Sequence, residues 1–377
     1  MSLRRTRAIA GKELIHIVRD PRSLIMALAI PLLLLLLFGY ALSLDVDRIP
    51  TLILDADRTP ESRDVIERFR GSRYFDVGGV VDRYATIQQQ IDRGACLLAV
   101  VIDQHFAEDL RGGREATVQL LVDGSDANTA SIALGYAEAL LQSYALEWQL
   151  RWADEHGLGA RAAPVQARLR VWYNSDMKSK NYIVPGLIAV ILMIIAALLT
   201  SLTIAREWEM GTMEQLLSTP VRATELVLGK MAAYFVVGFI DMLTALGVGV
   251  FIFDVPLRGS TLLVLGTSCL FLFGALCWGI LLSAVTRQQL AAFQLGILTS
   301  FLPAFLLSGF IFSIENMPGV VQLITHIFPA RYFVTALKGI FLKGVSVRVL
   351  WVELLFLLIY AVIVFVLATR ALRRQLA

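Results

Sequence analysis

The stretch REWEMGTMEQLLSTPVRATELVLGK, Arg206–Lys230, is charged and helix-like, yet it lies between two long apolar runs. A helix that begins near Gly211 places three apolar residues on one face, namely Met213, Leu216 and Leu217. The Thr219-Pro220 pair breaks this helix, because threonine can cap a second helix whose first position is proline. The pattern predicts a short elbow of two helices at a membrane surface. An ordinary amphipathic interfacial loop fits the pattern equally well.

The composition of the whole chain indicates an integral membrane protein. Of the 377 residues, 57% are hydrophobic and 17% are charged, and the mean hydropathy is +0.67. Soluble domains carry about a quarter charged residues. The net charge of +3 is too small to suggest a nucleic-acid partner. Cys96, Cys269 and Cys277 have no zinc or redox spacing, so we interpret them as small apolar core residues.

The apolar runs predict an α-helical membrane protein with six transmembrane helices, since about 20 apolar residues cross a bilayer. The expected spans are Ser23–Leu44, Ile183–Ala205, Met231–Phe253, Thr261–Val285, Leu290–Phe312 and Leu350–Ala368. A further apolar stretch, Met317–Phe341, contains prolines, glycines and basic residues that do not suit a lipid-exposed helix. We therefore expect a re-entrant helical hairpin before the last span, within residues 313–344.

Basic residues near the span ends predict that both termini are cytoplasmic. The segments on the side of the termini hold thirteen lysines and arginines, against five in the short segments on the other side. The expected organisation is an amphipathic cytoplasmic helix at 1–22, the first span at 23–44, an extracytoplasmic domain at 45–181 and the other spans at 182–377. The cytoplasmic helical elbow then occupies 206–230.

The extracytoplasmic segment is expected to fold as an α/β domain. TLILDAD, LLAVVID and TVQLLVDG are β-type runs rich in valine, isoleucine and leucine. TPESRDVIERF and YATIQQQIDRG have helical spacing, and Thr59-Pro60 predicts a helix start. A long helix is expected at Asn128–Glu155. RLRVWYN, at 168–174, is interpreted as a strand that leads back to the membrane.

No catalytic or nucleotide-binding motif occurs in the sequence. A phosphate-binding loop needs an upstream glycine and then Gly-Lys-Ser/Thr, whereas Gly11-Lys12 and Gly229-Lys230 lack both the glycine and the hydroxyl residue. The four histidines have no metal-ligand spacing, and no Gly-x-Ser-x-Gly turn is present. We expect no enzyme activity in this chain, and no metal or cofactor bound by it.

Asp241 lies in the middle of the third expected span, where an ionisable side chain is costly and often functional. It is a candidate translocation residue for a proton, a cation or a cationic substrate. The alternative role is structural, as a hydrogen-bond partner of Thr244 or of a serine on a neighbouring helix.

Two other classes of function fit the sequence less well. An ion-coupled secondary transporter using Asp241 should show paired broken helices, but only one broken segment is found. The second class is a membrane-anchored sensor whose outer domain binds a ligand. Six spans are more than an anchor needs, and the sequence predicts no cytoplasmic output domain.

The opening stretch resembles the signature Arg-Glu-x-Glu-x-Gly-Thr-x-Glu-Gln-Leu-x-x-Thr-Pro of ABC-2-type permeases, the membrane subunits of ATP-binding-cassette exporters. The matching positions are Arg206, Glu207, Glu209, Gly211, Thr212, Glu214, Gln215, Leu216, Thr219 and Pro220. Trp208 stands where the family often has lysine. Residues 11–24, 171–191 and 309–344 resemble the family's N-terminal helix, second-span entry and re-entrant segment. The resemblance covers almost the whole chain and is strongest for bacterial multidrug-type permeases.

The resemblance implies roles for particular residues. Those implied in coupling to an ATPase are Lys12, Glu13, Arg19, Arg206, Glu207, Glu209, Gly211, Thr212, Glu214, Leu217 and Pro220. Those of the implied re-entrant segment are Met317, Pro318, Pro329, Arg331, Tyr332 and Phe333.

The resemblance also implies partners and a location. It implies a bacterial inner-membrane protein that pairs with a second permease, identical or related, and with a separate cytoplasmic ATPase that binds ATP and magnesium. A periplasmic adaptor protein and an outer-membrane channel are further partners compatible with it. A polar glycan, a drug and a lipid are all compatible substrates.

Overall fold

The computed structural model of the chain describes residues 2–41, 48–155, 173–174 and 178–376. The chain divides into two units, a helical unit of Met1–Ser43 with Val171–Ala377 and an α/β unit of Leu44–Arg170. Most of the strand expected at 168–174, and the last three residues of the first expected span, lie outside the described residues.

The α/β unit contains a four-stranded sheet in the order β2-β1-β3-β4. Along the chain its elements are β1 (Ile49–Asp55), α3 (Pro60–Gly71), β2 (Phe75–Val81), α4 (Tyr84–Asp92), β3 (Leu98–Ile102), α5 (Phe106–Arg111), β4 (Val118–Val122) and α6 (Ala127–Glu155). β1 pairs in parallel with β2 and β3, whereas β4 is antiparallel to β3. The sequence predicts β1, β3 and β4 but not β2, because the Gly78-Gly79 pair is unfavourable in a strand.

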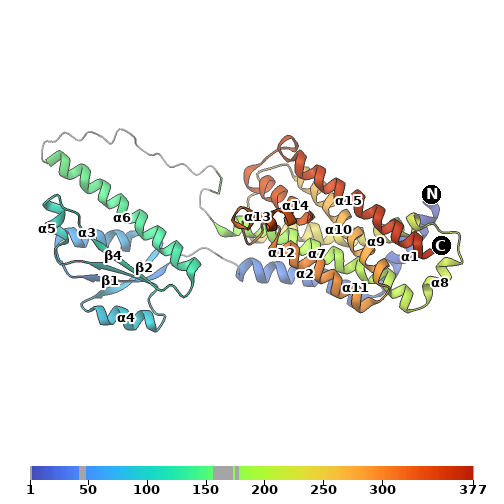
Figure 1. Cartoon of the computed structure of the whole chain (residues 1–377), viewed down its shortest axis with the longest axis horizontal. Helices are drawn as coiled ribbons and strands as arrows, with labels where there is room; N and C mark the ends of the chain where they lie inside the picture. Colours follow the sequence, from blue (N-terminus) through green and yellow to red (C-terminus); the bar gives the residue numbers. More distant parts are fainter. Residues whose placement is uncertain (1, 42–47, 156–172, 175–177, 377) are drawn as a thin grey trace. The chain divides into compact units, whose positions relative to one another are not determined.

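Helices cover both faces of this sheet (Figure 1). α3 and α6 cover one face, where Phe69 and Tyr144 belong to the same core as the strand residue Ile53. α4 covers the other face, where Ile87 packs with Cys96. Cys96 is thus a buried core residue, as the sequence predicts.

The predicted start of α3 is confirmed. Pro60 is the first residue of the helix, and the Thr59 side chain accepts a hydrogen bond from the Ser62 N–H at 3.3 Å. The Ser62 hydroxyl in turn accepts one from the Thr59 N–H at 3.1 Å. This reciprocal cap satisfies two backbone donors at the start of α3.

The helical unit is built from eleven α-helices within the described residues. They are α1 (Leu3–Arg19), α2 (Pro21–Ala41), α7 (Ser179–Glu209), α8 (Thr212–Leu217), α9 (Ala223–Gly247), α10 (Thr261–Thr286), α11 (Gln289–Gly296), α12 (Leu302–Leu306), α13 (Gly319–Thr325), α14 (Pro329–Lys338) and α15 (Val347–Leu376). Three π-helical turns continue these helices, η1 (Val248–Ile252), η2 (Ile297–Phe301) and η4 (Gly339–Lys343), and a short 3-10 turn, η3 (Ile314–Asn316), precedes α13.

Five helices among the described residues are long and apolar enough to cross a membrane. They are Ser179–Glu209, Ala223–Ile252, Thr261–Thr286, Gln289–Leu306 and Val347–Arg374, and each overlaps a predicted span. The described apolar part of α2 is shorter, Ala27–Ala41. α13 and the α14–η4 helix meet at an angle of 86°, which suits either a broken span or a re-entrant segment. The predicted re-entrant hairpin therefore stays a prediction.

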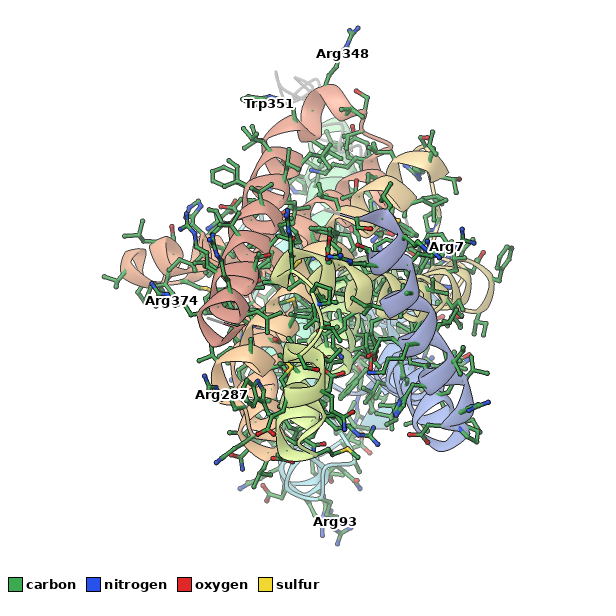
Figure 2. The ribbon with its side chains drawn as sticks, turned by 90° about the vertical axis from the view of Figure 1, so that its right-hand side faces the viewer. Arg7, Arg93, Arg287, Arg348, Trp351 and Arg374 are labelled. Carbon is green, nitrogen blue, oxygen red and sulfur yellow. The ribbon has the colours of Figure 1, made fainter. Side chains whose placement is uncertain are left out.

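Both chain termini lie at one end of the helical unit, beside α1 and α8 (Figure 1). We call this the terminal end. Figure 2 looks onto it and shows Arg7 of α1, Arg287 of the α10–α11 turn and Arg374 of α15 around its periphery. Basic side chains from three separate parts of the sequence therefore gather at this end.

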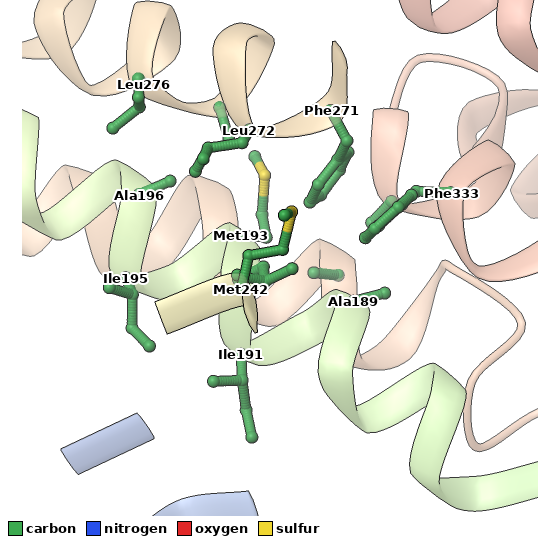
Figure 3. Packing of buried hydrophobic residues seen from close by; sticks show 14 of the residues in the cluster. Ala189, Ile191, Met193, Ile195, Ala196, Met242, Phe271, Leu272, Leu276 and Phe333 are labelled. Atoms are coloured by element: carbon green, nitrogen blue, oxygen red, sulfur yellow. The ribbon is translucent and has the colours of Figure 1, made fainter. Parts of the chain in front are cut away.

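α7 is the central helix of this unit and packs against α2, α9, α10, α11 and α14. Figure 3 shows Met193 and Ala196 of α7 close to Leu272 and Leu276 of α10. Beside them the rings of Phe271 and Phe333 stack with centroids 4.0 Å apart. The α10–α14 contact thus continues the same core.

α7 and α10 approach each other closely at small residues. A Cβ atom added to Gly279 would overlap Thr200 Oγ1 and lie 2.5 Å from the Ala197 carbonyl oxygen. The Thr200 hydroxyl donates to the Leu276 carbonyl across the interface at 2.9 Å. One turn further along α10, Ser283 Oγ lies 2.8 Å from the Ala205 nitrogen. Small residues that allow such close backbone approach are typical of packed transmembrane helices.

Candidate functional site

The terminal end brings together most of the residues that the sequence singles out. α1 lies directly against α9 there, because Gly229 has no side chain. A Cβ atom at Gly229 would lie 2.7 Å from Ile9 Cβ and 3.1 Å from the Thr6 carbonyl oxygen. The Gly229-Lys230 pair, which the sequence excludes as a phosphate-binding loop, therefore has a packing role.

A buried cluster of charges joins α1, α7 and α9. Lys230 Nζ lies 3.0 Å from Glu13 Oε1 and 3.0 Å from Glu207 Oε1, and the lysine is only 1% exposed. Lys12 Nζ lies 3.2 Å from the same Glu207 oxygen and 3.7 Å from Glu13 Oε1. Burial strengthens these attractions, but it also makes each partner costly to leave unpaired. The cluster therefore holds the three helices in one arrangement.

One carboxylate oxygen of this charge cluster lacks a hydrogen-bond partner among the described residues. Glu207 Oε2 is buried and has no hydrogen-bond partner among the described residues. Since Glu13 and Glu207 are both less than a tenth exposed, neither offers a free carboxylate surface to a docking protein. In the structure these two glutamates hold α1 and α7 against α9 through Lys230. This role differs from the direct contact with an ATPase that the resemblance implies.

A second set of contacts ties the start of α1 to the start of α9. The Glu225 carboxylate accepts hydrogen bonds from the Arg222 N–H at 3.1 Å and from the Ser2 nitrogen at 2.6 Å. Arg5 lies 3.8 Å from the same carboxylate and also donates to the Pro220 carbonyl. Glu225 thus caps α9 and anchors the N-terminal helix at the same time.

α8 is the short helix between α7 and α9. Gly211 has φ of 70°, a left-handed conformation that favours glycine, and it turns the chain between α7 and α8. Met213 is fully buried and anchors α8, while Glu214 and Gln215 are exposed. The Thr212 hydroxyl donates to the Glu207 carbonyl at 3.3 Å. The side chain of Leu217 lies outside those that the structure describes.

The last turn of α7 also contacts the next pair of helices. Glu209 accepts a hydrogen bond from the Gln289 N–H at 2.7 Å, at the first residue of α11. The Arg287 guanidinium lies 4.7 Å from the centre of the Trp208 ring. The start of α11 is therefore tied to the end of α7, next to the turn that leads into α8.

Two details of the predicted elbow are wrong. The predicted helix before the Thr219-Pro220 break is present as α8, but the elbow is shorter than the predicted 206–230, because Arg206–Glu209 is the end of α7 and Lys230 lies inside α9. Pro220 does not begin the second helix, which starts at Ala223 after an N-cap at Arg222. The Glu225 carboxylate provides the cap, which removes the need for the predicted threonine cap.

Arg206 and Arg19 lie apart from α8. Arg206 lines two neighbouring cavities beside α1, and Arg19, in the last turn of α1, lines one of them. Within the described residues neither forms a salt bridge, and both are exposed.

The bent α13–α14 pair holds its own polar groups. Arg331 donates to the Gln322 carbonyl at 3.2 Å and to the Thr325 hydroxyl, so it caps the end of α13. The Tyr332 hydroxyl lies 3.1 Å from His326 Nδ1, and the Tyr332 ring stacks on Phe356.

The other residues of this segment shape its two helices. Pro329 is the first residue of α14, Pro318 is the residue just before α13, and the Met317 carbonyl accepts a hydrogen bond from Gln322 at 2.9 Å. Phe333 packs against Phe271. Each of the six predicted residues of this segment therefore either begins one of its helices or packs or hydrogen-bonds within the helical unit.

Asp241 lies inside α9 and is 2% exposed. Its Oδ2 atom has no hydrogen-bond partner among the described residues. The Thr244 hydroxyl, one candidate partner, donates instead to the Ile240 carbonyl at 2.9 Å. Within the described part of the chain, no group of three or more metal-ligating side chains is found, here or elsewhere.

We expect Asp241→Asn to retain the parent's thermal midpoint and transport rate. Asparagine has the same shape, and an ionised carboxylate without a partner costs roughly 2.5–3.5 kcal/mol in a helix that crosses a bilayer. Asp254→Asn, at an exposed position beyond η1, is the matched control. Loss of transport in an Asp241→Asn variant as stable as the parent would show that the charge itself takes part in transport.

Sequence reasoning missed Lys230, Glu225 and Arg5 as parts of this site. Lys230 carries a signal that points to it, since it is a lysine at the edge of an apolar run where α9 has no other basic residue. Its partner Glu13 lies 217 residues away in the sequence, and its partner Glu207 lies on another helix, so the three-way pairing is not visible in the sequence.

Comparison with known proteins agrees with the family resemblance. A family model described as "ABC-2 family transporter protein" matches residues 21–370. The chain therefore belongs to the ABC-2 transporter family, and an ABC permease role in a multi-pass membrane protein follows from that membership.

Individual relatives share this character. The "Probable multidrug ABC transporter permease YbhS" of Escherichia coli (strain K12) is 41% identical over 363 residues, which is 96% of this chain and 95% of that protein. The "Probable multidrug ABC transporter permease YbhR" of the same organism is 31% identical over 342 residues, 90% of each chain. The "ABC transporter G family member 20" of Dictyostelium discoideum is 26% identical over 207 residues, 54% of this chain and 28% of that protein.

Proposed function

We propose that this chain is the transmembrane subunit of an ABC exporter in the bacterial inner membrane. It moves its substrate outward, and a separate cytoplasmic ATPase supplies the energy by binding and hydrolysing ATP with magnesium. Family membership favours this function over an ion-coupled transporter or an anchored sensor. The names of the relatives favour a drug-like substrate among the candidates.

One observation carries the proposal, namely how α8 is held. Met213 anchors α8 in the core, while Glu214 and Gln215 face away from it. The helices on either side of α8 are fixed to each other and to α1 by the buried charges of Glu13, Glu207 and Lys230. A protein that binds the exposed face of α8 and then moves would therefore displace α7, α9 and α1 together.

The orientation belongs to the same proposal. The basic residues on the side of the termini lie on α1, at the start of α2, at the end of α7, at the N-cap and within the first half of α9, in the α10–α11 turn and at the end of α15. Such an excess marks the cytoplasmic side of membrane proteins. The α/β unit then lies in the periplasm, where an adaptor protein that leads to an outer-membrane channel is its proposed partner. A second permease, identical or related, completes the transporter.

We expect Glu214→Lys to weaken binding of the ATPase while the permease still inserts and folds. The substitution reverses a charge on the exposed face of α8, where few internal contacts are at stake. Co-purification of the two subunits measures the effect. Glu67→Lys, an exposed glutamate of α3, is a control that should leave the complex intact. Full recovery of the complex together with normal transport in Glu214→Lys would contradict docking at α8.

We expect a cysteine at Gly124 to react with an impermeant thiol reagent in intact cells, and a cysteine at Thr212 to react only after the membrane is opened. Gly124 lies after β4 in the α/β unit, and Thr212 is the first residue of α8. Cys96 is replaced first to remove background labelling. Labelling of Thr212→Cys in intact cells would place the terminal end outside and refute the orientation.

A further inference from the structure

A cavity of about 370 Å³ lies beside α7, away from α8. Residues of α1, α2, α7, α9 and α11 line it, and none comes from α8. The volume falls within the range of sites for small molecules, about 300–1,000 Å³. The cavity is therefore large enough to hold a ligand or a substantial part of one.

The cavity has an apolar shaft along α7. The lining residues of α7 extend from Ile195 to Arg206, which at about 1.5 Å per residue corresponds to a length of about 16 Å. Leu198, Leu199 and Leu202 form its α7 wall. Ile30 and Phe293, also in the lining, are 46% and 39% exposed, so the shaft is accessible from the side of the helical unit.

One end of the cavity is charged. Arg206, His16 and Asp20 line it there, and the same three residues line an adjoining cavity of about 410 Å³ to which Lys12 and Arg19 also contribute. Lys12 is paired with the glutamates of the buried cluster. Arg19 and Arg206 form no salt bridge with a described residue, so this mouth holds two guanidinium groups beside one carboxylate.

We propose that this cavity binds a membrane phospholipid with an anionic head group. One acyl chain lies in the leucine-lined shaft, and the phosphate lies at the mouth against Arg19 and Arg206. Guanidinium groups suit this task because they donate two parallel hydrogen bonds to a phosphate. The place where the apolar lining gives way to charge corresponds to the level of the head groups, which supports a lipid of the bilayer as the occupant.

The test is native mass spectrometry of the purified full-length chain, titrated with phosphatidylglycerol or with phosphatidylcholine of the same acyl chains. The parent should bind phosphatidylglycerol about tenfold more tightly, which corresponds to about 1.4 kcal/mol, because both lipids carry the phosphate but only phosphatidylcholine brings a quaternary ammonium close to the two arginines. Arg19→Gln with Arg206→Gln should abolish that preference. Leu199→Trp, which fills the shaft, should weaken binding of both lipids.

Matched controls separate the site from general lipid binding. Arg374→Gln removes a basic residue at the terminal end that does not line the cavity, and Leu298→Trp enlarges an exposed side chain of η2. Both should bind lipid as the parent does. If Leu199→Trp has a lowered thermal midpoint, Leu202→Phe serves as the shaft variant.

Three outcomes would overturn the proposal. They are equal affinity of the parent for the two lipids, an unchanged preference in the double arginine variant, and an unchanged affinity in a folded shaft variant. Competition by inorganic phosphate alone, as strong as that by phosphatidylglycerol, would also overturn it, because the site would then recognise an anion without a chain. The measurement uses the isolated chain, so its result is independent of ATPase docking.

Discussion

Lys230→Met is expected to unfold or strongly destabilise the helical unit, by about 3–5 kcal/mol. The substitution removes the only fully buried cation of the cluster and leaves Glu13 and Glu207 with the half-exposed Lys12 as their remaining partner. The two buried carboxylates then repel each other, and a single exposed lysine does not compensate for the cost of burying them. The yield of monodisperse protein and its thermal midpoint in detergent measure the loss.

Lys12→Met is the matched control for this experiment. Lys12 lies within 3.7 Å of the same two carboxylates, but its side chain is 57% exposed. Solvent screens an exposed ion pair, so this variant should lose much less stability. Adding Glu13→Gln and Glu207→Gln to Lys230→Met should restore much of the loss, since no buried charge is then left unpaired and water solvates the exposed Lys12. Equal effects of the two lysine substitutions would show that burial of Lys230 is not what matters.

Gly279→Ala is expected to disrupt the contact between α7 and α10, although it adds a single methyl group. That methyl group overlaps Thr200 Oγ1 and lies 2.5 Å from the backbone oxygen of Ala197, which cannot rotate away. Overpacking typically costs about 1–3 kcal/mol, and we expect a loss of at least about 3 kcal/mol here because backbone is involved. The thermal midpoint and folded yield again provide the measurement.

Gly266→Ala is the control on the same helix. A Cβ atom at Gly266 meets nothing within 4 Å, so alanine should raise helix stability by up to about 1 kcal/mol. Gly279→Ala combined with Thr200→Ala should recover only part of the loss, because the Ala197 oxygen remains in place. A Gly279→Ala variant as stable as the parent would mean that α7 and α10 separate without cost.

Much of the fold follows from local patterns that the sequence displays openly. Runs of apolar residues place five of the spans, and the strand patterns around Ile53, Val100 and Leu120 place three strands of the α/β unit. The cap at Thr59 is a two-residue signal that needs no tertiary contact. Such features depend on near neighbours in the chain, which is why they can be predicted.

The parts that escaped prediction depend on distant residues. Lys230 pairs with Glu13, which is 217 residues away in the sequence, and no sequence spacing predicts such a pair. Pro220 stands where a helix could start, but the Glu225 carboxylate caps the helix at Arg222. The cavity beside α7 exists only because α1, α2, α9 and α11 converge there. The sequence around Gly279 does not show that a side chain there would clash with Thr200, because the two residues lie on different helices.

The tight union of α7 with α10 has a mechanical consequence. α7 has 31 residues, so it is a rod about 46 Å long at about 1.5 Å per residue. A tilt of about 5° at its terminal end sweeps the opposite tip through about 4 Å over that length. Because α10 is locked to this rod and α14 stacks on α10 through Phe271 and Phe333, all three would swing together. If a partner pushes α8 as we propose, this tilt would move the opposite end of α7 by about 4 Å.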